Sequence, residues 1–360
     1  MLALRYVPSA LVAITLASWA WTQTFGPLMA LGLTALFGAV VLGRQSFGPW
    51  PAMLGVGVLV ASTVLAIPFA NTGFGRPDAA AFMAMWTAFM AMLYLVDHHE
   101  RTLWHLVPAA LLLAGLLVWQ RLHGIPQAYG GPMGPNPAGG MLALGVAFLL
   151  PTRARWMVLP LLVGLACTGS RSALLAAAVA IGAWLLMGGV SRRALVRLAV
   201  VGGLVAVVTL PWLLNGFTRA DARQGMSVWS WYRLDAQNRF SVPSGDDGHP
   251  LWPSLLPRGP AGTFIGLHNI PLRMAYEQGI IAAATWIALT AWALWRRPRG
   301  TSAWYMMLVF TVIAMVDYYP MMPLVTSAFW WVLLSMRLKL HCRARTADTG
   351  ESPPGSAMTR

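Results

Sequence analysis

The chain has 360 residues, of which 58% are hydrophobic and only 10% are charged. A soluble domain needs a more charged surface than this, so the composition excludes an ordinary soluble protein and predicts a polytopic α-helical membrane protein. The formal net charge is +14, which in a soluble protein would favour nucleic acid as a partner. Here the basic residues lie mostly in short loops between apolar runs, where membrane topology and lipid headgroups account for them without nucleic acid.

Twelve apolar runs follow one another along the chain, and each predicts a membrane-spanning helix. Several are shorter than the roughly 20 residues that a perpendicular helix needs, so we expect the pair within 138–168 to be tilted or partly re-entrant. The first run leads straight into a second one, which argues against a cleavable signal peptide. The predicted spans lie near residues 7–22, 26–42, 51–69, 79–96, 103–119, 138–151, 156–168, 172–189, 195–214, 272–294, 301–316 and 323–338.

The basic residues predict the orientation of these spans. Arginines cluster in the short loops 191–197 and 296–299, and such clusters favour the cytoplasmic side. A cytoplasmic N-terminus puts both loops, and sixteen of the 25 basic residues, inside. We therefore expect a multi-pass membrane protein with the long hydrophilic loop 215–267 on the outer side, which in a bacterial inner membrane is the periplasm.

The predicted organisation is one membrane domain with a short tail. Residues 1–342 are expected to form the transmembrane helical domain, which includes the periplasmic loop 215–267. Residues 343–360 are polar and contain a Pro-Pro pair, which predicts a disordered cytoplasmic tail. The two cysteines suggest neither a disulfide framework nor a metal site, and the chain has no Gly-rich nucleotide loop. We expect no cofactor and no bound metal.

A run rich in Gly and Pro, 129–140, leads into the span near 138–151. This composition predicts an irregular backbone with unpaired amides, which at membrane depth must line a cavity or be covered by protein. Asn136 lies within the run and is a candidate ligand for a sugar or a phosphate. An ordinary loop is the equally supported alternative.

A short polar break separates the spans near 156–168 and 172–189, and it contains Ser170 and Arg171. A guanidinium at membrane level is costly unless it faces a polar cavity or a partner. The neighbouring glycine and serines suit close backbone approach and hydrogen bonding to an anion. Arg171 is therefore a candidate phosphate ligand, and a structural ion pair is the alternative.

The most concentrated polar pattern lies where the long loop re-enters a span. His268 and Asn269 precede Pro271, which is well placed in the first turn of a helix. Asn269, Arg273 and Glu277 recur every four residues and therefore share one helix face. A histidine can accept a proton near neutral pH, so His268 is a candidate base for activating a hydroxyl group. The alternative for this face is an Arg273–Glu277 ion pair that only anchors the helix.

These motifs resemble the signature of bacterial O-antigen ligases and of the related O-antigen polymerases and O-oligosaccharyltransferases. His268-Asn269 is followed after nine residues by Gly279, and then by a small residue three positions later. The Ser-Arg turn within 168–175 looks like the turn that precedes a span in this family. The Gly-Pro-Asn sequence at 134–136 is similar to the family's Asn-containing start of an earlier span. The resemblance covers roughly residues 120–295 by motif.

The resemblance implies an all-α transmembrane bundle of the C-class glycosyltransferase type and an inverting, metal-independent transfer. The donor would be a glycan carried on undecaprenyl diphosphate, and the acceptor would be a hydroxyl group at the periplasmic face. Two residues would be catalytic: His268 as general base or acceptor-orienting group, and Arg171 as a ligand of the diphosphate. The candidates for binding the diphosphate and the glycan are Arg219, Arg223, Asn136, Ser170, Asn269, Arg273 and Glu277.

The acceptor stays open among three molecules. A ligase, which we favour, uses lipid A–core; a polymerase uses another lipid-linked repeat unit; and an O-oligosaccharyltransferase uses protein. A function from another class is a twelve-span transporter or flippase, whose hallmarks are internal repeats and charged or broken helices near the middle of the membrane. The sequence shows few charges within its spans and no halves that align.

Overall fold

The structure is a computed structural model that describes residues 47–69, 77–98, 100–125, 128, 135–188, 252–257, 269–317 and 325–348. The regular structure of these residues is helical throughout, without a strand, so the expected all-α class is confirmed for them. The predicted spans near 7–22, 26–42 and 195–214, most of the loop 215–267 and the end of the predicted tail lie outside the described residues.

The described helices follow the apolar runs of the sequence. Apart from 272–294, each predicted span in this part of the chain is occupied by one α-helix, and two of these helices begin with a 3-10 turn. The elements are α3 (Trp50–Phe69), α4 (Pro77–Leu95), η2 (Glu100–His105), α5 (Leu106–Leu122), α6 (Pro135–Leu149), η4 (Arg155–Met157), α7 (Val158–Thr168), α8 (Arg171–Met187), α11 (Ile270–Glu277), α12 (Ile280–Trp295), α13 (Ser302–Val316) and α14 (Val325–Asp348).

The expectation of one continuous span at 272–294 is wrong, because two helices, α11 and α12, occupy this stretch. The break lies at Gln278 and Gly279, and Gly279 has a φ of +89°. Only glycine adopts this conformation without strain. A Cβ atom at Gly279 would also lie 2.5 Å from the backbone oxygen of Leu255, so the segment Trp252–Pro257 packs directly over the break.

Two further expectations about irregular chain are wrong in part. The Gly- and Pro-rich run is helical from Pro135 onward, because proline fits the first turn of a helix, where its missing N–H costs nothing. At the other end of the chain, α14 continues to Asp348, past the predicted start of the disordered tail at residue 343. The residues between Lys339 and Asp348 include no glycine or proline, so nothing in the sequence stops the helix there.

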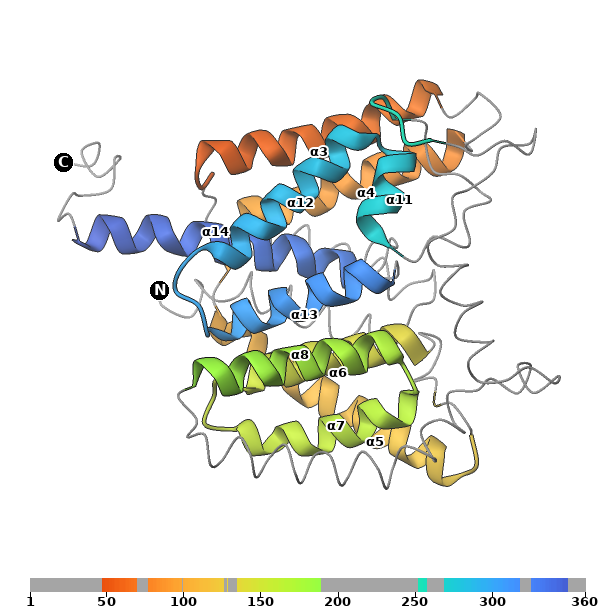
Figure 1. Cartoon of the computed structure of the whole chain (residues 1–360), viewed down its shortest axis with the longest axis vertical. Coiled ribbons are helices and arrows are strands. Elements are labelled where there is room, and N and C mark those ends of the chain that lie inside the picture. The colour runs from red at the N-terminus through yellow and green to blue at the C-terminus, as the bar shows by residue number, and fades with distance from the viewer. Residues whose placement is uncertain are drawn as a thin grey trace.

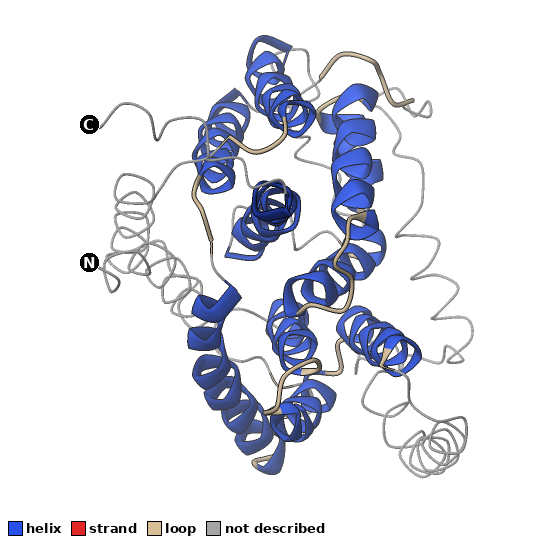
Figure 2. Ribbon diagram, turned by 90° about the vertical axis from the view of Figure 1, so that its left-hand side faces the viewer, coloured by secondary structure: helices blue, strands red, loops and turns tan. Residues whose placement is uncertain are grey.

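The helices form two groups that α13 joins. On one side α13 packs against α6 and α8, which are accompanied by α5 and α7; on the other side it packs against α11, α12 and α14, next to α3 and α4. Figure 1 shows α5 to α8 in the lower part of the view, and α3, α4, α11 and α12 in the upper part. Figure 2 looks along many of these helices from the left-hand side of Figure 1.

The inner helices are buried on all sides, whereas the outer helices expose large apolar side chains. Every residue of α6 from Ala138 to Leu149 is buried, and so is the stretch 328–339 of α14. Large apolar side chains lie exposed on outer helices, such as Leu112 in the middle of α5 and Leu159 in the first turn of α7. By length and composition α3 could cross a membrane, while the other apolar helices in the described part of the chain are shorter. Exposed apolar faces of this kind are typical of contact with lipid.

Candidate functional site

A buried carboxylate marks the place where several polar motifs meet. Asp317 follows the last residue of α13 and is only 2% exposed. Its Oδ2 atom accepts hydrogen bonds from Asn136 Nδ2 at 3.4 Å and from Ser172 Oγ at 3.2 Å. Asn136 lies in the first turn of α6 and Ser172 in the first turn of α8. Three helix ends that are far apart in the sequence are thus tied to one acceptor, and we call these residues the Asp317 cluster.

The turn between α7 and α8 brings Ser170 next to this cluster, and Arg171 lies between Ser170 and Ser172 in the chain. Thr168 Oγ1 accepts a hydrogen bond from the backbone N–H of Ser170 at 3.1 Å, which closes the turn. The Ser170 and Ser172 hydroxyls lie 3.4 Å apart, and Ser170 is fully buried. Arg171 is the first residue of α8 and is half-buried. The backbone of Arg171 therefore lies at the positive end of a helix dipole, where an anion is favoured.

Gly139 lets α6 approach this turn. A Cβ atom at this position would lie 2.7 Å from Ser170 Cβ and 3.1 Å from Thr168 Oγ1, which is closer than such atoms pack. The absence of a side chain at Gly139 is therefore what brings the first turn of α6, with Asn136, against the turn between α7 and α8. From Pro135 onward, the Gly- and Pro-rich run contributes to the cluster as a closely packed helix start.

Asn269 connects α11 to the same end of α13. Its Oδ1 atom accepts a hydrogen bond from the backbone N–H of Leu272 at 2.8 Å, so Asn269 is the N-cap that the sequence pattern predicts. Its Nδ2 atom donates to the backbone oxygen of Met315 at 2.7 Å, two residues before Asp317. His268, which immediately precedes Asn269 in the chain, lies outside the described residues, as do Arg219 and Arg223.

Arg273 and Glu277 form an ion pair along α11. Arg273 Nε lies 2.9 Å from Glu277 Oε1, and Glu277 is buried whereas Arg273 is partly exposed. This is the contact that the helix-anchoring alternative expects. Binding of diphosphate or glycan by these two residues stays a prediction.

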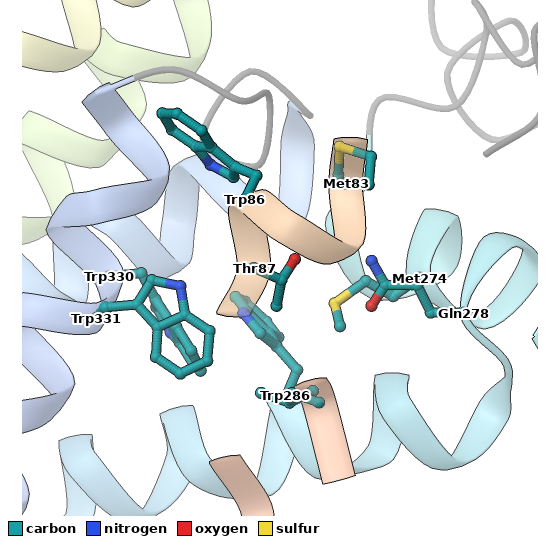
Figure 3. A pocket seen from close by; sticks show the side chains of 9 residues that line it. Met83, Trp86, Thr87, Met274, Gln278, Trp286, Trp330 and Trp331 are labelled. Atoms are coloured by element: carbon teal, nitrogen blue, oxygen red, sulfur yellow. The ribbon is translucent and has the colours of Figure 1, made fainter. Parts of the chain in front are cut away.

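A small aromatic pocket lies on another side of α11. Figure 3 shows Met274 of α11 and the adjoining Gln278 on one side, Trp330 and Trp331 of α14 on the opposite side, and Trp286 of α12 between them. Leu59, Met83, Trp86 and Thr87 complete the lining. The pocket is mainly apolar, and the Trp286 indole N–H has no hydrogen-bond partner among the described residues.

At the opposite ends of the helices, the buried Arg337 and the partly buried Glu100 form hydrogen bonds with backbone atoms. Arg337 donates to the backbone oxygens of Ala293, Arg296 and Pro298, at and just beyond the end of α12. Glu100 Oε1 accepts a hydrogen bond from the backbone N–H of Ala303 in the first turn of α13. These hydrogen bonds satisfy backbone groups at the ends of helices, which is a structural role.

Asp317 was missed by the sequence analysis, although the sequence holds a signal for it. It is a lone carboxylate directly after the apolar run near 301–316, and a charge at such a position is costly unless it has partners. Its partners Asn136 and Ser172 are 181 and 145 residues away in the chain, so no local pattern connects them.

Within the described part of the chain, no group of three or more His, Cys, Asp or Glu side chains could hold a metal ion. No model of a known protein family matches the chain, and a search of curated proteins finds no match either. The proposed function therefore rests on the geometry of the Asp317 cluster and on the sequence motifs that meet there.

Proposed function

We propose that this protein is a glycosyltransferase of the O-antigen ligase type, embedded by about twelve spans in a bacterial inner membrane. It would move a glycan from undecaprenyl diphosphate to an acceptor hydroxyl group on the periplasmic face. The observation that supports this best is that Asn136, Ser172 and Asn269 all reach the end of α13 around Asp317. These residues come from the same three stretches of sequence that resemble the ligase signature.

The packing of helix ends agrees with the alternating topology that the proposal needs. The starts of α6, α8 and α11 are predicted to lie outside, as is the end of α13, and these four ends meet around Asp317. The predicted inner ends meet as well: Ser302 Oγ, at the start of α13, donates to the backbone oxygen of Phe148 near the end of α6 at 2.8 Å. Antiparallel neighbours of this kind are what successive spans produce.

The distribution of charge favours a transferase over a transporter. The described helices α3, α6, α7, α12 and α13 contain no charged residue at all. In α5 and α8 the charged residue lies in the terminal turn. A transporter concentrates polar and charged groups near the middle of the membrane, whereas a transferase acting on lipid headgroups needs them at one rim.

The chemistry assigned to the cluster is a direct displacement at the anomeric carbon. The acceptor oxygen forms a bond to this carbon while the bond to the phosphate oxygen breaks, so the configuration inverts and undecaprenyl diphosphate leaves. His268 would take the proton of the acceptor hydroxyl, an effect on the order of 10² to 10⁴ in rate. Arg171, helped by Arg219 and Arg223, would stabilise the negative charge on the leaving diphosphate.

Asp317 would act as a positioning residue in this scheme. Its hydrogen bond to Ser172 fixes the residue that follows Arg171, and its hydrogen bond to Asn136 fixes the start of α6 against the same turn. Asn269, held to Met315, would fix the start of α11 and with it the chain next to His268. The guanidinium group of Arg171 and the imidazole group of His268 would then be held in fixed positions relative to each other, which a displacement reaction needs.

The test uses purified protein in nanodiscs with an undecaprenyl-diphosphate-linked glycan and lipid A–core. Product formation is followed by gel shift and mass spectrometry for the wild type, His268→Ala, Arg171→Ala and the control Arg153→Ala, whose side chain is exposed at the other end of α7. We expect His268→Ala and Arg171→Ala to abolish transfer, while Arg153→Ala retains it. Full activity in both site variants would overturn the proposed mechanism.

The same assay separates the alternatives. Elongation of the lipid-linked glycan without lipid A–core would identify a polymerase, and transfer to a serine-containing peptide would identify an O-oligosaccharyltransferase. Movement of the lipid-linked glycan across the bilayer without any new glycosidic bond would identify the protein as a flippase instead of a transferase.

A further inference from the structure

The segment Trp252–Pro257 presents an apolar surface although it comes from the long hydrophilic loop. Trp252 is 70% exposed, and Leu255 and Leu256 are exposed to a similar extent. Ser254 is its only residue with a polar side chain, and the Ser254 hydroxyl donates to the backbone oxygen of Leu256. Apart from the indole N–H of Trp252, the exposed side chains of the segment are therefore apolar.

This segment is attached to the start of α12. The backbone N–H of Ile280 donates to the backbone oxygen of Ser254 at 2.8 Å. Gly279 allows this contact, because a Cβ atom there would meet the backbone of Leu255 and Leu256. Figure 1 shows the segment as the short coloured loop at the end of α12 that adjoins α11.

The exposed surface of the segment continues along α12. Ile280 and Ile281 are exposed in the first turn, and the exposed face runs on through Ile287 to Trp295 at the far end. Every exposed residue on this face is apolar. Thr285, which borders it, turns its hydroxyl back to the backbone oxygen of Ile281.

The two ends of this face differ in charge. Trp295 lies next to three arginines, and the guanidinium group of Arg299 lies 5.1 Å from the centre of its ring. The opposite end is covered by the uncharged segment with Trp252. Tryptophan at both ends of an apolar face is the pattern of a protein surface that crosses both membrane interfaces.

The length of α12 explains why an added segment is useful. Its 16 residues span about 24 Å, while the hydrocarbon core of a bilayer is about 30 Å thick. The segment Trp252–Pro257 lies at the start of α12 and extends the apolar surface past the first residue of the helix. It does so beside the break at Gly279, next to α11.

We propose that Trp252–Pro257 is a membrane anchor that inserts Trp252, Leu255 and Leu256 at the boundary between headgroups and acyl chains of the outer leaflet. The partner is the lipid bilayer. The anchor holds the break between α11 and α12, and with it the start of α11, at headgroup level. The inference rests on the membrane-embedded part of the proposed function and does not depend on glycan transfer.

The experiment measures the depth of spin labels in nanodiscs of phosphatidylethanolamine and phosphatidylglycerol. Single cysteines replace Leu256, Ile287 and Arg297 in turn, in a background with Cys167→Ala and Cys342→Ser. Collision with oxygen and with a water-soluble nickel chelate reports the depth of each label. We expect Ile287→Cys to report acyl chains, Arg297→Cys to report water, and Leu256→Cys to report the boundary, with a several-fold higher oxygen-to-nickel ratio than Arg297→Cys.

The outcomes separate this inference from the proposed function. A label at Leu256 as accessible to the nickel chelate as the label at Arg297, while Ile287 reports acyl chains, would overturn the anchor and leave the transferase proposal standing. A label at Ile287 that reports water would overturn both. Leu255→Cys is an independent reporter on the same segment, and Trp252→Gln in the Leu256→Cys protein should move the label toward water.

Discussion

Replacing Gly139 by alanine tests whether the close approach of α6 to the turn between α7 and α8 matters for function. The new Cβ atom would lie 2.7 Å from Ser170 Cβ, and 3.1 Å from Ala173 Cβ and from Thr168 Oγ1. Carbon atoms pack at about 3.5 to 4.0 Å, so α6 or the turn must move by about 1 Å. This movement separates Asn136 from the turn that carries Arg171.

The stability and the activity of Gly139→Ala should respond differently. Overpacking costs about 1 to 3 kcal/mol, and the higher helix propensity of alanine returns about 1 kcal/mol, so the net loss in the free energy of unfolding is at most about 2 kcal/mol. Glycan transfer should fall about 100-fold, because a displacement of about 1 Å in a reacting arrangement has an effect of that size.

The assay compares Gly139→Ala with Gly182→Ala in α8. Nothing lies within 4 Å of a Cβ atom at Gly182, so that variant gains helix propensity without a clash. Thermal unfolding in detergent measures stability, and product formation from the lipid-linked glycan measures activity. If Gly139→Ala matched Gly182→Ala in both measurements, the reasoning about the Asp317 cluster would be refuted.

Three other predictions concern Asp317, Gly279 and metal ions. Asp317→Ala leaves the Asn136 amide and the Ser172 hydroxyl without this acceptor. The free energy of unfolding should therefore fall by about 1 to 3 kcal/mol, and glycan transfer should be lost. Normal transfer in this variant would show that Asp317 is not a positioning residue. Gly279→Ala forces a residue with a side chain into a φ of +89° against the backbone of Leu255, so its melting temperature should drop, whereas that of Gly182→Ala should not. EDTA should leave transfer intact, and a strict requirement for added Mg²⁺ or Mn²⁺ would contradict the metal-independent mechanism.

Local sequence patterns predicted most of the described helices and one part of the site. The apolar runs near 51–69 and 301–316 became α3 and α13 because a mainly apolar segment without charged residues satisfies its backbone groups within a helix. The pattern at Asn269 and Pro271 predicted the start of α11, because capping involves only neighbouring residues. Both outcomes depend on contacts within a few residues along the chain.

The remaining features were decided by contacts between distant segments. The segment Trp252–Pro257 lies against the break at Gly279, and the turn before α8 lies against α6 at Gly139; both are contacts between segments far apart in the chain. The role of Asp317 could not be read locally, since both of its hydrogen-bond donors come from helices much earlier in the chain. A sequence determines which residues are apolar, capped or able to bend, but packing determines which helix ends meet, because the contacts of one end depend on all the others.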